Sequence, residues 1–516
     1  MEKNIRAGSS NRGQLLRYFG FFAAPVLAAY LIFFADLEPD NPAVTNTLAV
    51  AILMALWWMT EVVPLAVTSL LPLVLFPALG VMDGKTVSAA YFNHVIFLFI
   101  GGFLVALAIQ KWNLHKRIAL NILRLVGSSP ARIMLGFMFG TAFLSMWISN
   151  TATAMLMVPI AMSIVSKLEE INGPGLVRKF TIGLLLSIAY SASTGGIATL
   201  VGTPPNLSFA RIFHIYFPEA PEISFASWFF FAFPITLTLF IIIFFYLRIF
   251  FIGRSRDWKS LRRKDMTQDY RALGPMIFEE KVLTFAFVAL ALLWFFRADI
   301  AFGSFTLPGW SNLFKNPQFF NDGTVAIFVA VLLFIIPSKQ EKGTFLMDWK
   351  AAEGIPWEII LLFGGGFALA SGFKESGLST WFGQQLEFLR SVHPVVLIAS
   401  ICFLVTFLTE VTSNTATVET LLPILAGLAI TIEENPLLFM LPATISGSMA
   451  FMLPVATPPN AIIFGTRRLQ IAHMAKAGLA LNLIGVVVIT LITYYLGTEI
   501  FDIAKGVFPE WAKVGH

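Results

Sequence analysis

The sequence predicts an all-α polytopic membrane protein with about 11 transmembrane helices and two re-entrant hairpins, arranged as inverted repeats. Three observations support this fold class. Charged residues make up 13% of the 516 residues, about half of the roughly 25% that is usual in soluble domains. Apolar stretches long enough to cross a bilayer recur along the chain. The two halves of the chain also carry the same polar motifs at matching positions.

The composition excludes several classes of function. Residues of the AVILMFWYC set make up 57% of the chain, so a soluble fold would expose more apolar surface than water tolerates. We attribute the net charge of +5 to basic loops that orient the chain in the membrane, not to nucleic-acid binding. Cys402 is the only cysteine, which excludes an internal disulfide and a Cys-based metal site. The histidines are scattered without a metal-binding motif, at His94, His115, His214, His393, His473 and His516.

Eleven stretches are apolar enough to predict helices that cross a bilayer. They cover residues 18–36, 46–60, 64–81, 92–110, 180–210, 227–251, 281–298, 323–337, 356–373, 437–465 and 477–497. The first stretch follows a basic N-terminal segment and resembles a signal peptide near Ala28 and Ala29, but its apolar residues continue to Phe34. We therefore interpret it as an uncleaved first span.

Two further apolar stretches, 131–165 and 394–430, each carry a Ser-Asn-Thr cluster in the middle. We expect each of them to form a hairpin that enters and leaves the membrane on the same side. The distribution of charge supports this topology. With residues 1–17 cytoplasmic, counting the spans places the basic segments inside (111–132, 253–280, 339–350 and 467–476) and the acidic segments outside (36–40 and 433–434). The positive-inside rule is satisfied only if both hairpins are re-entrant, and residues 501–516 are then extracytoplasmic.

Two polar segments interrupt the apolar stretches. The segment 253–280 is basic and is interpreted as a cytoplasmic linker between the two halves, with a regulatory or partner site as the alternative. The segment 299–322 contains Pro308, Gly309 and Pro317 and predicts an extracellular loop.

The two halves form an internal repeat. The motif Phe-x-Gly-Gly-Phe occurs at residues 99–103 and 363–367, an offset of 363 − 99 = 264 residues. The same offset relates the two Ser-Asn-Thr-Ala-Thr motifs, at 149–153 and 413–417, and a Thr-Pro-Pro-Asn motif follows each of them, at 203–206 and 457–460. Because the hairpins enter from opposite sides, the repeats are inverted. Inverted repeats with Gly/Pro-interrupted segments at matching positions are the sequence signature of a secondary transporter.

The paired motifs place interrupted helices at membrane depth. Two successive prolines stop a helix, and irregular backbone is tolerated in a bilayer only where it is buried in protein or lines a cavity. Hydroxyl, amide and free carbonyl oxygens suit Na⁺, whereas amide protons, hydroxyl protons and helix N-termini suit carboxylates. No Lys, Arg, Asp or Glu lies within 145–161, 201–207 or 455–463. We therefore expect an anion to be bound by neutral dipoles, with bound cations supplying the positive charge.

Several residues also have a purely structural interpretation. A single Ser-Asn-Thr cluster is explained by hydrogen bonding between helices, but two copies in register, each followed by Thr-Pro-Pro-Asn, favour a binding site. Glu410 and Glu419 stand where the first half has Met146 and Met155. Each is either a proton or cation group or a locally paired side chain, and the local role is favoured for Glu419. Glu61 is interpreted as a helix-end residue, and the glycine pairs as points of close helix packing.

The motif Trp57-Trp58-Met59-Thr60-Glu61 with Pro64, together with the paired Ser-Asn-Thr and Thr-Pro-Pro-Asn motifs, resembles the divalent anion:sodium symporter (DASS) family. The resemblance covers about residues 18–497. The family contains sodium-coupled dicarboxylate and citrate transporters and some sulfate transporters. It implies a homodimer in which each protomer has a scaffold domain and a mobile transport domain that work as an elevator.

The resemblance also implies domain boundaries and site residues. Scaffold helices are expected in 18–125 and 281–390, and the two halves of the transport domain in 126–252 and 391–500. One sodium site would be formed by Ser145, Ser149, Asn150 and the backbone of Gly202, and a second by Thr409, Thr412, Asn414 and the backbone of Ala456. Substrate carboxylates would meet Asn150, Thr151, Thr203, Pro204, Ser413, Asn414, Thr415, Thr457 and Pro458.

The resemblance and the uncharged motifs together predict a sodium-coupled importer of C4-dicarboxylates such as succinate, malate or fumarate, in the plasma (inner) membrane. Sodium is expected as the co-transported ion, without an organic cofactor. Citrate or sulfate transport coupled to sodium, and sodium-independent exchange, are the alternatives within transport. An intramembrane enzyme or a channel is the alternative from another class, but no His/Asp or Ser/His pair at membrane depth supports an enzyme.

Overall fold

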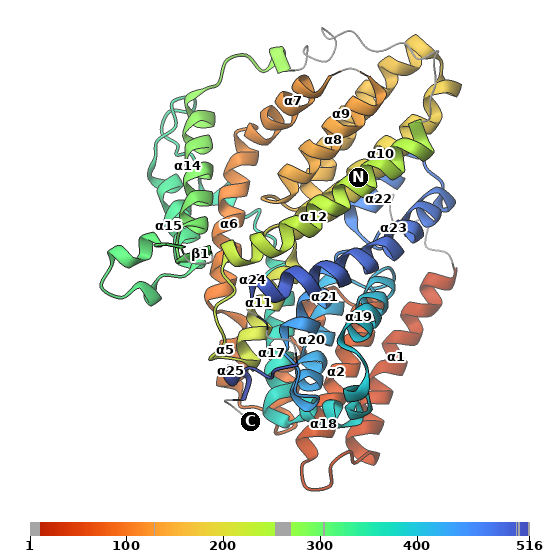
Figure 1. The fold of residues 1–516 in the computed structure, drawn as a ribbon, viewed down its shortest axis with the longest axis vertical. Helices are drawn as coiled ribbons and strands as arrows, with labels where there is room; N and C mark the ends of the chain where they lie inside the picture. Colours follow the sequence, from red (N-terminus) through yellow and green to blue (C-terminus); the bar gives the residue numbers. More distant parts are fainter. Residues whose placement is uncertain are drawn as a thin grey trace.

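The computed structural model describes residues 11–127, 129–252, 270–302, 305–501, 503 and 506–513. This part of the chain is almost entirely helical (Figure 1). The described residues contain eight helical segments long and apolar enough to cross a membrane, and six shorter apolar helices. The predicted all-α polytopic fold class is therefore confirmed. Most of the expected linker 253–280 and both ends of the chain lie outside the described residues.

The first part of the chain forms three long helices and four shorter ones. They are α1 (Asn11–Phe34), α2 (Pro42–Thr60), α3 (Leu65–Thr68), α4 (Leu71–Ala78), α5 (Gly84–Tyr91), α6 (His94–Lys111) and α7 (Leu114–Val126). The predicted span 64–81 falls on α3 and α4, which are separated by a turn at Ser69 and Leu70; α4 begins at Leu71, with Pro72 in its first turn. The helix α7 was not predicted, because it is amphipathic and its sequence contains no continuous apolar stretch.

Next come the first expected hairpin and a broken helix. The hairpin consists of α8 (Pro130–Ser145) and α9 (Asn150–Asn172), and the broken helix of α10 (Pro174–Ile197) and α11 (Pro204–Tyr216). The helix α12 (Phe225–Leu247) continues as a π-helical turn, η3 (Arg248–Ile252). The predicted span 180–210 therefore covers two helices, and the break falls where Pro204 and Pro205 remove backbone donors.

The second half repeats this order after a short polar region. It begins with α14 (Phe278–Phe295), the antiparallel strands β1 (Ile300–Phe302) and β2 (Phe305–Leu307), and the 3-10 turns η4 (Trp310–Leu313) and η5 (Pro317–Phe319). It continues with α15 (Asp322–Ile335), α16 (Trp349–Ala352), α17 (Trp357–Ser376), α18 (Leu378–Gln385) and η6 (Glu387–Ser391). The segment 299–322 thus forms a folded hairpin and turns where a loop was expected.

The last part contains the second expected hairpin and a second broken helix. The hairpin is α19 (Pro394–Leu408) with α20 (Asn414–Thr431), and the broken helix is α21 (Leu437–Ser446) with α22 (Pro458–Gly465). The chain then forms α23 (Ile471–Ile492), the π-helical turn η7 (Thr493–Gly497), α24 (Thr498–Ile500) and α25 (Glu510–Lys513). The predicted span 437–465 therefore covers two helices. As in 180–210, the break lies just before a Pro-Pro pair.

The two repeats interlock. The helix α6 of the first half packs on α15 of the second, whereas α17 of the second half packs on α2, α3 and α5 of the first. Figure 1 shows α14 and α15 at one flank of the molecule and α1 and α2 at the other. A side chain at Gly101 would collide with the backbone of Ala326, and one at Gly365 with the backbone of Ser69. The glycine motifs therefore allow close helix packing, as the sequence indicated.

Ion pairs between distant segments agree with the predicted topology. Each of the following joins residues that the span count places on the same side of the membrane: Lys111–Asp348, Arg117–Glu280, Arg468–Glu169, Arg297–Asp322 and Arg390–Glu433. In the first pair, the hydrogen bond from the Lys111 ammonium lowers the pKa of the Asp348 carboxyl below its ordinary value. The arrangement supports re-entrant hairpins, and the assignment of the cytoplasmic face remains a prediction.

Candidate functional site

The first hairpin turns through residues 146–149, and its tip is fixed by hydrogen bonds. The Ser149 hydroxyl accepts a hydrogen bond from the backbone N–H of Ala152 at 3.2 Å, which caps the start of α9. The Ser145 hydroxyl lies 2.7 Å from the carbonyl oxygen of Ala192 in α10 and also contacts the Asn150 amide oxygen. Three of the residues expected at the first sodium site therefore lie at one hairpin tip.

The break between α10 and α11 lies against this tip. The Thr199 hydroxyl contacts the carbonyl oxygen of Met146, and a side chain added at Gly196 would collide with the Asn150 amide and approach the Gly202 carbonyl oxygen. Close packing of the tip on the break thus requires glycine at position 196. It also brings the Gly202 backbone, expected at the first sodium site, close to Asn150.

The second hairpin tip repeats this geometry. The Thr409 hydroxyl donates to the Asn414 amide oxygen at 2.6 Å, five residues further along the chain, just as Ser145 does to Asn150. It also lies 3.0 Å from the carbonyl oxygen of Gly447, at the end of α21. The Thr412 hydroxyl, expected at the second sodium site, is hydrogen-bonded to the Leu408 carbonyl oxygen and the Thr417 hydroxyl, and its role in sodium binding stays a prediction.

Both breaks are held by the asparagine of the Thr-Pro-Pro-Asn motif. The Asn206 amide nitrogen lies 2.8 Å from the carbonyl oxygen of Thr199 and 3.2 Å from that of Gly196. The Asn460 amide nitrogen makes the equivalent bonds, 2.9 Å to Leu453 and 3.0 Å to Ala450. These bonds satisfy carbonyl groups that the interrupted helices leave free.

The two halves differ at Glu410. Its carboxylate accepts hydrogen bonds from three successive backbone N–H groups, those of Phe451, Met452 and Leu453, at 2.7–3.1 Å. It also accepts one from the Asn482 amide at 2.7 Å. Of the two interpretations left open for this residue, the structure favours local pairing: Glu410 anchors the second break and satisfies backbone donors there.

The motifs present four helix N-termini. Thr203 and Thr457 are the N-caps of α11 and α22, and Ser149 and Ser413 those of α9 and α20. Free backbone N–H groups at such termini favour carboxylate oxygens. The amide oxygens of Asn206 and Asn460 are buried and have no hydrogen-bond partner among the described residues. Buried acceptors of this kind suit a small hard cation such as Na⁺.

The predicted site residues thus form two corresponding clusters. Each cluster joins one hairpin tip to the break of the same repeat, and the clusters approach through the packing of α9 on α22 and of α11 on α20. Thr203, Thr415, Ala456 and Thr457 are buried, Thr151, Pro204 and Ser413 are half-buried, and Pro458 is exposed. Within the described part of the chain, neither the Thr151 hydroxyl nor the Thr415 hydroxyl donates a hydrogen bond.

Sequence reasoning missed four residues of these clusters. Asn206 and Asn460 were seen only as parts of a motif, although their recurrence after both Pro-Pro pairs was a signal for a paired role. Gly196 and Asn482 carry no such signal, because their contacts arise between segments distant in sequence.

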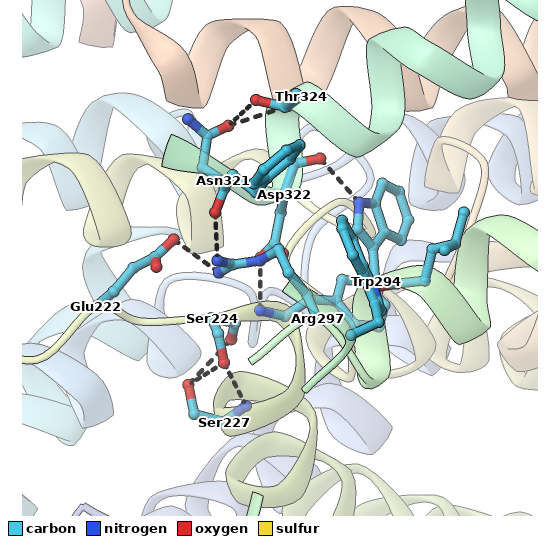
Figure 2. Close-up of polar contacts among 12 residues, drawn as sticks. Glu222, Ser224, Ser227, Trp294, Arg297, Asn321, Asp322 and Thr324 are labelled. Carbon is cyan, nitrogen blue, oxygen red and sulfur yellow. Dashed lines mark hydrogen bonds and ion pairs between the residues drawn. The ribbon is translucent and has the colours of Figure 1, made fainter. Parts of the chain in front are cut away.

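A cavity borders the first break, where Leu200 and Leu207 line it, and extends away from the predicted site residues. It has a volume of about 310 Å³ and is lined by residues at the start of α6, the end of α11 and the start of α15. One wall carries an ion-pair cluster, in which the buried Arg297 bridges the buried Asp322 and the exposed Glu222 (Figure 2). None of the predicted site residues lines this cavity.

The fold and the family match together define a polytopic membrane transporter, not an enzyme. The family described as "Sodium:sulfate symporter transmembrane region" matches residues 24–501, and the chain belongs to this divalent anion:sodium symporter family. It is 42% identical to the "Sodium-dependent dicarboxylate transporter SdcS" of Staphylococcus saprophyticus, over 97% of this chain and 98% of the relative. It is 39% identical to the "Na(+)/citrate cotransporter" of Rattus norvegicus, over 96% of each chain.

Two solved structures share the fold. The YdaH transporter of Alcanivorax borkumensis matches with a TM-score of 0.52 and 14% identity, over 80% of this chain and 86% of that one. MtrF of Neisseria gonorrhoeae matches with a TM-score of 0.50 and 15% identity, over 91% and 96% of the two chains. At this identity the likeness concerns the fold alone.

Proposed function

We propose that the protein is a sodium-coupled symporter that imports C4-dicarboxylates such as succinate, malate and fumarate. The observation that carries the proposal is the duplicated tip-and-break cluster, in which uncharged oxygen donors lie beside helix N-termini. The names of the relatives, a sodium-dependent dicarboxylate transporter and a sodium/citrate cotransporter, support the same assignment.

The proposed order of events follows from electrostatics. A dianion is poorly held by neutral dipoles alone, because removing its charge from water is costly. Sodium ions bind first, at Ser145, Ser149, Asn150 and the Gly202 backbone in one repeat, and at Thr409, Thr412, Asn414 and the Ala456 backbone in the other. Their charge then favours substrate carboxylates at the N-termini that start with Asn150, Pro204, Asn414 and Pro458.

Movement of the loaded site is proposed to follow an elevator mechanism. The hydrogen bonds Thr199–Met146 and Thr409–Gly447 tie each tip to its own break. The packing of α9 on α22 and of α11 on α20 joins the two halves. Together these contacts support the proposal that residues 126–252 and 391–500 move as one transport domain. The scaffold is assigned to residues 18–125 and 281–390, and the working unit is proposed to be a homodimer in the plasma membrane, with a cytoplasmic N-terminus and an extracytoplasmic C-terminus.

Uptake of labelled succinate into proteoliposomes tests this function. We expect uptake to require an inward sodium gradient and to be lost when choline replaces sodium. Uptake that persists in choline would indicate a sodium-independent exchanger and contradict the coupling.

Competition by unlabelled anions tests the substrate. We expect malate and fumarate to inhibit succinate uptake more strongly than citrate or sulfate. Stronger inhibition by citrate would assign the chain to the citrate carriers, a second candidate that the 39% identity to the rat cotransporter favours.

A further inference from the structure

Glu419 is a carboxyl group that the proposed transport cycle does not use. It lies on α20 five residues after Asn414, about 7.5 Å further along the helix axis. Its side chain is fully buried. One carboxyl oxygen accepts a hydrogen bond from the Ser208 hydroxyl on α11 at 2.7 Å, whereas the other has no partner among the described residues.

The surroundings of Glu419 leave little room for a neutralising ion. The carboxyl group packs directly on Gly366 of α17, where an added side chain would overlap it. The elements packed on α20 are α2, α11, α17, α18, α19 and α21. Their charged or titratable side chains include Arg211 and His214 on α11, Glu358, Lys374 and Glu375 on α17, and Cys402 on α19. None of these side chains is hydrogen-bonded or ion-paired to Glu419 in the described part of the chain.

Glu410, in contrast, has the hydrogen-bond donors that Glu419 lacks. Four N–H donors surround the Glu410 carboxylate, enough to replace the water that an ionised carboxylate loses on burial. Glu419 has one hydroxyl donor. An unpaired buried carboxylate is costly, so binding a proton is the remaining way to neutralise the group. The corresponding residue of the first repeat, Met155, is exposed, so the repeat architecture itself does not require a carboxyl group here.

We propose that Glu419 is a proton-binding site that stays protonated through the transport cycle. The bound proton keeps the contact between α20 of the transport domain and α17 of the scaffold electrically neutral. An ionised Glu419 would place an unpaired negative charge one and a half turns from the substrate-binding end of α20, and would repel the dianion. The role in transport rests on the proposed function, whereas the protonation itself does not.

Infrared difference spectroscopy of the purified protein tests the protonation directly. At neutral pH we expect a carbonyl stretching band of a protonated carboxylic acid in the wild type that is missing in Glu419→Gln. The matched control is Glu358→Gln, which changes an exposed glutamate on α17 and should leave the band in place. Identical spectra of wild type and Glu419→Gln would overturn the proposal.

A second variant keeps this test decisive if Glu419→Gln fails to fold. Ser208→Ala removes the one hydroxyl that is bonded to Glu419, so the carboxylic-acid band should shift in frequency without disappearing. An unchanged band in Ser208→Ala would mean that the protonated group lies elsewhere.

Transport assays separate a proton site from a sodium ligand. Because glutamine resembles a neutral glutamic acid in shape, Glu419→Gln should retain uptake within about twofold of the wild type, with an unchanged sodium concentration for half-maximal uptake. A rise of roughly tenfold in that concentration, worth about 1.4 kcal/mol, would identify Glu419 as a sodium ligand and contradict the proposal. Wild-type protein that shows the infrared band but no sodium-dependent uptake would refute the proposed function alone.

Discussion

Asn206 and Asn460 occupy equivalent places in the two broken helices, and each amide bonds to the carbonyl oxygens ten and seven residues before it. The same spacing in two segments 254 residues apart (460 − 206) shows that the breaks share one backbone conformation. Because the amide nitrogen is bonded to carbonyl groups, the amide oxygen points away from them and has no hydrogen-bond partner in the described part of the chain. The motif thus both shapes the break and leaves one acceptor oxygen available.

We predict that Asn460→Ala lowers the stability of the protein by about 2–4 kcal/mol. The change removes two hydrogen bonds and leaves buried carbonyl groups unsatisfied, at about 1–3 kcal/mol for each unsatisfied group. Thermal unfolding in detergent measures the loss. Asn46→Ala is the matched control, since its amide makes one bond, to the Leu79 carbonyl oxygen, on a half-buried face. Equal melting temperatures for the two variants would contradict the role of Asn460.

Asn150→Asp and Asn414→Asp are each expected to abolish succinate uptake. A fixed negative charge at either helix start repels the substrate dianion, and a protonated aspartate still lacks the NH₂ donor that the asparagine amide offers to carboxylate oxygens. Uptake in proteoliposomes at saturating sodium measures the effect, and a normal melting temperature shows that the variant is folded. Uptake at the wild-type rate in either variant would show that the substituted asparagine is not part of the proposed site.

Much of this site follows from sequence because the motifs recur. The register of the repeat located both hairpin tips and both breaks, and Pro204, Pro205, Pro458 and Pro459 set where the second helix of each broken pair begins. The hydrogen bonds that hold Asn206 to Gly196 do not follow, because they depend on how the irregular backbone folds back on itself.

Other features depend on contacts between distant segments. The role of Glu410 was left open by the sequence, because the three N–H groups that bind it lie about forty residues further along the chain. Short helices such as α7 were not predicted from apolar stretches, because an amphipathic surface helix has no continuous apolar stretch. The hydrogen bonds of the Thr412 hydroxyl within its own hairpin were likewise not predicted from the sequence.

Arg297→Ala should destabilise the protein far more than Glu222→Gln. Arg297 lies against Asp322, and both side chains are about 5% exposed, whereas the Glu222 side chain is 54% exposed (Figure 2). Removing the arginine leaves Asp322 as an uncompensated buried charge, at about 3–5 kcal/mol. The exposed pair contributes about 0.2–1 kcal/mol. Chemical or thermal unfolding of the two variants in detergent measures the difference, and similar losses would mean that the Asp322 carboxylate is solvated in the folded protein.

The re-entrant topology predicts which positions are reached from outside the cell. Gly175, in the first turn of α10, should be cytoplasmic, whereas Glu433, after α20, should be extracellular. Both positions are exposed, and Cys402 is fully buried, so it should not react. With a membrane-impermeant maleimide on intact cells, Glu433→Cys should be labelled and Gly175→Cys should not. After lysis, both variants should be labelled, which serves as the accessibility control. If the hairpin α8–α9 crossed the membrane instead of returning, Gly175 would lie outside, and labelling of Gly175→Cys on intact cells would reject the inverted repeats.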